Sequence, residues 1–156
     1  MKVPDILVVG FGNTLAGDDG AGPVVVENLQ RRKLPPRLRV EYCGSDSLVL
    51  PSLWQGETEI WLVDALVRRN PPGSIFMLNH DEVLSIPQRH ATVHHLSLPE
   101  SLRWISLTYP EMKSVRYRLW GIEPDEFRIA DGLSSEVEKA VSMVADRILD
   151  AVSELS

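Results

Sequence analysis

The sequence lacks several features that define common classes of protein. Its 156 residues contain a single cysteine, Cys43, which excludes an internal disulfide bond and any zinc site built from several cysteines. No apolar run approaches the roughly 20 residues of a membrane-spanning helix. The short apolar run at residues 6–11 lacks the basic segment and the cleavage site of a secretion signal. We therefore expect a cytoplasmic protein.

Positive charge is also scarce. The chain has 16 Lys and Arg against 22 Asp and Glu, which gives a net charge of −6, and it contains no basic run. We therefore predict neither nucleic acid nor a membrane surface as a partner. Hydrophobic residues make up 44 % and charged residues 24 %, which is typical of a folded globular protein. The length suits one domain spanning residues 1–156, and we expect a monomer.

Short apolar runs alternate with helix-like stretches, a pattern typical of an α/β fold with a mostly parallel sheet covered by helices. The continuously apolar run Ile6–Val9 predicts a central strand that is buried on both faces. Pro23 suits the first turn of a helix, which we expect to end at Leu34–Pro36. The alternation of apolar residues with Arg116 and Arg118 predicts an edge strand. The other strands of a sheet of about five are predicted at residues 37–42, 59–63 and 74–78.

Three further helices are predicted. A short one lies between residues 47 and 54, and Ser97 with Glu100 predicts a capping box at the start of another. Ser135 and Glu138 predict the cap of the last helix. One face of that helix is apolar, through Val137, Val141, Val144, Ile148 and Val152.

A glycine-rich loop follows the first strand, over residues 10–22. Such a loop between a strand and a helix is often a phosphate cradle, and Gly10 and Gly12 match the first two positions of G-x-G-x-x-G. Leu15 stands where the third glycine belongs, and the carboxylates at positions 18 and 19 would repel a pyrophosphate. Glu41 has the position of a ribose-binding acid. A nucleotide- or dinucleotide-binding module is therefore one hypothesis.

The same carboxylates support a second hypothesis, a metal site. Asp64 lies at the carboxyl end of a buried strand, the edge where open α/β sheets bind ligands. If the first and third strands are neighbours, Asp19 and Asp64 converge there, and His94 or His95 adds an imidazole. Two carboxylates and one imidazole form an open site for Zn²⁺ or Ni²⁺.

Each of these residues also has a purely structural interpretation. Asp18 or Asp19 would flank the start of a helix, Asp64 would cap a turn, and His94 would serve as a hydrogen-bonding residue. We expect His80 and His90 at the surface, Cys43 as a small buried side chain, and the four tryptophans in packing roles.

Four motifs, in order along the chain, resemble those of the nickel–iron hydrogenase maturation endopeptidases. The first, residues 6–22, reads I-L-V-V-G-F-G-N-T-L-A-G-D-D-G-A-G and is similar to the amino-terminal signature of that family. The second is Leu62–Ala65, which contains the strand-end aspartate. The third is Val93–Leu98, with a histidine before a helix, and the fourth is Gly121–Pro124.

The resemblance implies a twisted sheet sandwiched between helices and a divalent cation held by Asp19, Asp64 and His94, with Gly12, Asn13 and Asp18 as supporting loop residues. It also implies one activity. The enzyme would remove a carboxyl-terminal extension from the precursor of the hydrogenase large subunit after nickel insertion, and it would recognise the nickel that the substrate supplies. Zn²⁺ or another divalent ion would fit the isolated enzyme.

Two departures from the family pattern concern the acids. Asp19 stands where many members have Glu, so the cation must lie closer to the loop. The acid that many members carry after the second strand is absent or displaced to Asp46, and we therefore assign no catalytic nucleophile. A non-catalytic nickel carrier that uses the same three ligands is a further hypothesis.

Overall fold

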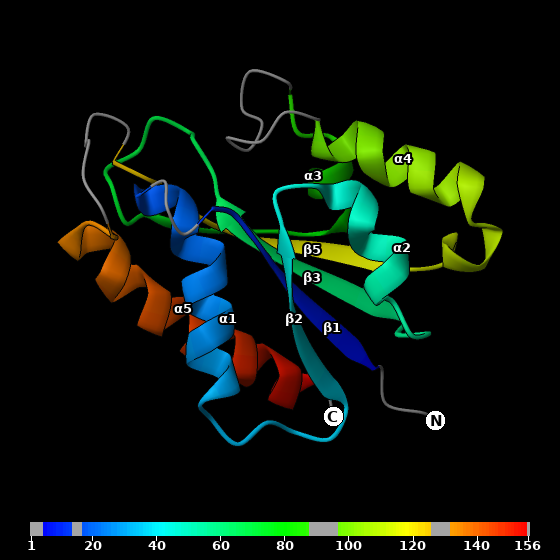
Figure 1. The fold of residues 1–156 in the computed structure, drawn as a ribbon, viewed down its shortest axis with the longest axis horizontal. Helices are drawn as coiled ribbons and strands as arrows, with labels where there is room; N and C mark the ends of the chain where they lie inside the picture. The colour runs from blue at the N-terminus through cyan, green and yellow to red at the C-terminus, as the bar shows by residue number, and fades with distance from the viewer. Residues whose placement is uncertain (1–4, 14–16, 88–96, 126–131, 156) are drawn as a thin grey trace.

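The computed structural model describes residues 5–13, 17–87, 97–125 and 132–155. These residues form one α/β unit (Figure 1). The strands are β1 (Ile6–Phe11), β2 (Leu38–Gly44), β3 (Glu59–Ala65), β4 (Ile75–Leu78) and β5 (Arg116–Ile122). The α-helices are α1 (Ala21–Gln30), α2 (Leu50–Leu53), α3 (His80–Leu84), α4 (Leu98–Thr108) and α5 (Ser135–Glu154), and the 3₁₀ helices are η1 (Gly17–Gly20), η2 (Ser47–Val49) and η4 (Pro110–Met112). Among the described helices, none is both long enough and apolar enough to span a bilayer.

The strands form a single sheet in the order β2-β1-β3-β5-β4. The first four strands in this order run parallel, and β4 pairs antiparallel with β5. This confirms the predicted five-stranded, mostly parallel sheet. The first and third strands are neighbours, which meets the condition for Asp19 and Asp64 to converge. Every residue of β1 is buried, as its continuous apolar run predicts.

Helices cover both faces of the sheet. Figure 1 shows α1 and α5 side by side on one face and α2, α3 and α4 on the other. The predicted apolar face of α5 is buried along its whole length and packs with Val8, Trp61 and Val63 from the sheet. Helix α4 buries Leu102 and Ile105 against the opposite face, with Leu62 and Leu119. Each parallel strand therefore contributes alternate side chains to two separate cores.

The prediction of an edge strand at residues 115–119 is wrong, because β5 lies between β3 and β4. The prediction was based on the alternation of arginines with apolar residues, which is also typical of an exposed strand. Arg116 is exposed, and the Arg118 guanidinium lies over the ring of Trp61, 4.4 Å from its centroid. Short β4 pairs only with Leu119–Ile122, so the first half of β5 keeps the character of an edge.

Helix α3 was not predicted. It supplies a hydrogen-bond acceptor to the half of β5 that β4 does not pair with. Asn79 begins α3 with a capping box that includes Glu82. The main-chain amide of Tyr117 donates to Nδ1 of His80, at 2.9 Å, and the two rings stack. His80 is therefore half-buried and structural, not simply a surface residue as expected.

Two predicted caps are also wrong in detail. Ser97 precedes α4, but its side chain makes no capping hydrogen bond. Pro99 in the first turn has no amide to offer a cap. The last helix is capped by Ser134, whose Oγ accepts from the amide of Val137, and not by Ser135.

Candidate active site at the carboxyl end of the sheet

Close approaches at glycines fold the loop after β1 back onto the strand ends. Gly12 has φ +139°, and a Cβ there would lie 1.9 Å from the carbonyl oxygen of Asp19. A Cβ at Gly22 would lie 2.5 Å from the carbonyl oxygen of Val63. Only glycine fits at either position, so η1 and the start of α1 pack directly against the carboxyl ends of β1 and β3.

Hydrogen bonds hold this loop from two sides. The amide of Gly12 donates to the carbonyl of Gly44, at 2.9 Å, and the Tyr42 hydroxyl donates to the carbonyl of Gly12, also at 2.9 Å. The amide of Asn13 donates to Oδ2 of Asp19, at 3.1 Å. Tyr42, at the end of β2, was missed in the sequence because its role depends on which strand lies beside β1.

Asp18 is a structural anchor. Its side chain is 6 % exposed and accepts from the amides of Asp125 (2.9 Å) and Ser134 (2.7 Å), and from the Ser134 hydroxyl (2.8 Å). Asp18 therefore ties η1 to the start of α5. The structural interpretation expected Asp18 to flank the start of the helix that follows the loop. Asp18 does have a structural role, but it bonds to the start of α5.

Asp64 is the penultimate residue of β3 and is 3 % exposed. Its Oδ1 accepts from the amide of Ala65, at 2.8 Å. Because side chains alternate along a strand, Asp64 shares a face with Leu62, which packs in the core beneath α4. A nearly buried carboxylate at the end of a parallel strand lies where α/β sheets bind ligands.

The structure thus brings two of the predicted ligands to one edge of the sheet. Strands β1 and β3 are adjacent, and η1 packs on their carboxyl ends. Asp19 belongs to η1, and Asp64 belongs to the end of β3. His94, His95 and His90 lie outside the described residues. Within the ranges that the structure describes, no group of three His, Cys, Asp or Glu side chains is arranged to hold a metal ion. A three-ligand site here needs a donor from beyond those ranges.

Glu123 is a buried acid that the sequence did not single out. It is 2 % exposed and accepts from the amides of Arg68, at 2.9 and 3.1 Å, and Asn70, at 3.0 Å. These bonds shape the loop that follows β3, where Arg69 has φ 60°. The position of Glu123 within the Gly121–Pro124 motif was the only feature of the sequence that pointed to this residue.

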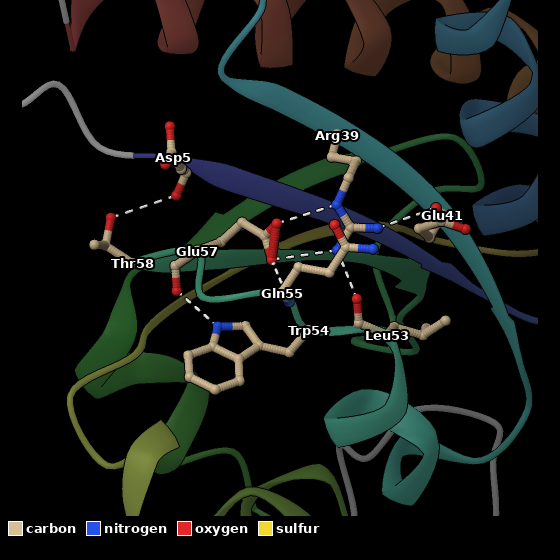
Figure 2. Close-up of polar contacts among 8 residues, drawn as sticks. All are labelled: Asp5, Arg39, Glu41, Leu53, Trp54, Gln55, Glu57 and Thr58. Carbon is tan, nitrogen blue, oxygen red and sulfur yellow. Dashed lines mark hydrogen bonds and ion pairs between the residues drawn. The ribbon is translucent and has the colours of Figure 1, made fainter.

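At the amino end of the sheet, Arg39 is the centre of a second polar cluster (Figure 2). Its guanidinium bonds to both carboxylate oxygens of Glu57, at 3.0 and 3.2 Å, and to Glu41, at 3.1 Å. Burial alone would raise the pKa of Glu57, but hydrogen bonds from Arg39 and from the amide of Gln55 lower it overall. Glu41, the acid of the dinucleotide hypothesis, is therefore part of an ion-paired cluster.

Cys43 is half-buried, and its thiol donates to the carbonyl of Asp46, at 3.4 Å. Burial and, to a lesser degree, the charge of Asp46 raise the pKa of the thiol to about 12. Such a thiol stays protonated and is a poor nucleophile.

Fold and site together define an α/β protein with a carboxylate-bearing loop at the carboxyl edge of its sheet. The family model described as "Hydrogenase maturation protease" matches residues 23–151. The chain belongs to the hydrogenase maturation protease family and is an endopeptidase.

Relatives and solved structures agree with this assignment. The chain is 34 % identical over 157 residues to a protein of Methanocaldococcus jannaschii named as a candidate hydrogenase maturation protease, with 97 % of this chain and 99 % of that protein covered. It is 27 % identical to the hydrogenase maturating endopeptidase HybD from Escherichia coli, with a TM-score of 0.77 over 96 % and 92 % of the two chains. The maturation protease HybD from Thermococcus kodakarensis shares the fold, with a TM-score of 0.80, 22 % identity, and 94 % and 98 % coverage.

Proposed function

We propose that this protein removes a carboxyl-terminal extension from the precursor of a nickel–iron hydrogenase large subunit after nickel insertion, and that Asp19, Asp64 and His94 recognise the inserted nickel. Membership of the maturation protease family supports the reaction. The observation that carries the choice of residues is the packing of η1 on the ends of β1 and β3, because it brings the segments of Asp19 and Asp64 to one edge.

The donor set suits this role. Two carboxylates and an imidazole are ligands for borderline divalent cations such as Ni²⁺ and Zn²⁺. In our proposal the nickel arrives as part of the substrate, so its binding aligns the bond to be cut with the carboxyl edge of the sheet. A divalent ion in that position polarises a carbonyl or activates a water molecule. Precursor without nickel would not dock, which gives the enzyme a check on its substrate.

The chain's own residues prepare the loop for this docking. The bond from the amide of Asn13 orients the Asp19 carboxylate, and Tyr42 fixes the carbonyl of Gly12 beside it. Asp18 fixes the other side of the loop to α5. The Asn13 amide and the Tyr42 hydroxyl are neutral donors, so they orient the loop without cancelling the negative charge of Asp19.

The test compares cutting of purified precursor with and without nickel. We expect the wild-type protein to cut only the nickel-loaded form. We expect His94→Ala to lower the rate at least ~100-fold, as for loss of a metal ligand, with an unchanged circular dichroism spectrum. His80→Asn is the matched control, because His80 accepts a hydrogen bond from the amide of Tyr117, asparagine keeps an acceptor, and the variant should cut normally.

Two results would contradict the proposal. Equal cutting of both precursor forms would show that the enzyme does not recognise the nickel. Near-normal cutting by the His94→Ala variant would remove His94 from the site.

A further inference from the structure

A pocket of about 340 Å³ has Leu66, two residues after Asp64, in its lining. It is lined by Leu66 and Leu78 from the sheet side, by Ile86 and Pro87 after α3, and by Arg68 and Glu82. Leu66 and Leu78 are almost fully buried, whereas Arg68 and Glu82 are exposed. The pocket therefore combines an apolar floor with a polar rim, the usual composition of a binding site.

The lining residue Leu66 relates the pocket to the carboxyl end of β3. Leu66 follows Asp64 by two residues, so both side chains lie on one face of the sheet. Gly121 of β5 pairs with Asp64 of the adjacent strand β3, and a Cβ at Gly121 would lie 2.9 Å from the Cβ and Cδ2 atoms of Leu66. The missing side chain of Gly121 lets Leu66 lie over the sheet next to Asp64.

Arg68 is a positioned cation at the rim. Its guanidinium carbon lies 4.9 Å from the centroid of the Phe76 ring, and its amide is held by the Glu123 carboxylate. In a chain with a net charge of −6, this exposed guanidinium offers hydrogen-bond donors to an incoming oxygen beside the apolar pocket. The loop that carries it is already shaped by Glu123.

We infer that this pocket binds an apolar side chain of the precursor next to the bond that is cut, while Arg68 donates hydrogen bonds to an oxygen of the same segment. The inference rests on the proposed function, because that function places the reaction beside Asp64. A polypeptide segment is the occupant that an endopeptidase requires. The volume is near the lower end of the ~300–1,000 Å³ range of ligand sites, which suits one or two side chains better than a cofactor.

The main test fills the pocket with Ser85→Trp. Ser85 is an exposed lining residue whose hydroxyl donates to the carbonyl of Asp81, at 2.8 Å. The matched control is Ser52→Trp, because the exposed Ser52 hydroxyl makes the same kind of bond, to the carbonyl of Val49 at 2.6 Å, away from the pocket. We expect Ser85→Trp to raise KM for nickel-loaded precursor ~10-fold or more with little change in kcat, as for a lost apolar subsite.

A substrate change and a second variant complete the test. Replacing the large apolar residue beside the cut with Ala should restore part of the affinity of the Ser85→Trp variant. Arg68→Gln, which leaves the core intact, should raise KM about fivefold for a lost hydrogen bond to a charged donor. Wild-type KM in both pocket variants would overturn the inference.

Asp19→Asn, assayed in parallel, separates the two proposals. If it abolishes cutting while both pocket variants keep the wild-type KM, only the pocket inference fails. If it cuts normally, Asp19 is not a nickel ligand and that part of the proposed function fails, while the KM values of the pocket variants still decide the pocket.

Discussion

The two ends of the sheet hold their carboxylates in different ways. At the amino end, Glu57 and Glu41 are bonded to the guanidinium of Arg39, so positive and negative charges lie together (Figure 2). At the carboxyl end, Asp18, Asp64 and Glu123 accept bonds from main-chain amides. Amides are neutral, so they orient a carboxylate and leave its charge for other use. Ion pairs therefore stabilise the amino end of the sheet, whereas the carboxyl end keeps oriented, charged acids that suit a cation.

Within the carboxyl end, the adjacent residues Asp18 and Asp19 differ in the same sense. Asp18 is buried and serves the packing of α5, whereas Asp19 is only partly buried and accepts from the amide of Asn13 within its own loop. If one acid is structural and the other functional, variants of Asp18 should lose mainly stability and variants of Asp19 mainly cutting.

The largest effect is expected for Asp19→Asn. Loss of a charged ligand should lower the rate of precursor cutting at least ~100-fold. Asparagine keeps an oxygen that can accept from Asn13, so the midpoint of thermal unfolding should stay close to wild type. The measurements are a cleavage time course and a melting curve, with Glu41→Gln from the amino end as the control. A large loss of stability with normal cutting would reverse the assignment of Asp19.

Asp18→Ala should act mainly on stability. It leaves the buried amide of Ser134 and the partly buried amide of Asp125 without their acceptor, and we expect a loss of about 3 kcal/mol in the free energy of unfolding. Urea unfolding measures this loss. A cost below about 1 kcal/mol would show that Asp18 is not an anchor.

At the amino end, Arg39→Ala should cost about 2 kcal/mol, because the largely buried Glu57 loses its cation. The pKa of Glu57 is lowered in the folded state, so its contribution is present above the ordinary value of 4.5 and is lost as pH falls below it. The stability difference between wild type and variant should therefore shrink in acid. Precursor cutting should be unchanged when assayed well below the melting temperature, and a fall in its rate would contradict the separation of the two ends.

The smallest effect is expected for His80→Ala, about 1 kcal/mol for the lost hydrogen bond from the amide of Tyr117. Burial, and then the nearby charge of Arg116, lower the pKa of His80 below 6.5. The neutral ring is the acceptor, so wild-type stability should fall as pH drops below 6.5. His80→Asn keeps an acceptor that does not titrate, and urea unfolding at pH 7.5 and 5.5 should show a smaller fall for it. An equal fall in the free energy of unfolding for both proteins would show that titration of His80 does not cause the loss of stability.

The sequence predicted the parts of the molecule that depend on local pattern. The buried run at β1 and the apolar face of α5 follow from periodicity. The meeting of the Asp19 and Asp64 segments was conditional on β1 and β3 being neighbours, and the strand pairing meets that condition. The site's supports could not be predicted in this way. Tyr42 and Glu123 act on segments that only the folded chain brings near them.

The errors have the same physical origin. Arg116 and Arg118 gave β5 the pattern of an edge strand, because β4 covers only its second half. In the first half, the amide of Tyr117 donates to His80 of α3 instead of to a strand. Ser135 was a reasonable cap by spacing, but the neighbouring Ser134 is fixed by Asp18, more than one hundred positions earlier in the chain. In each case a contact distant in sequence overrode a local preference.

The central claim is that Asp19, Asp64 and His94 share one ion. The most direct measurement is a crystal structure of the protein soaked with Ni²⁺, with the ion located by its anomalous scattering. Our account predicts one nickel at ~2.0–2.2 Å from a carboxylate oxygen of Asp19, a carboxylate oxygen of Asp64 and a ring nitrogen of His94. Nickel bound elsewhere, or the three groups facing different surfaces, would contradict it.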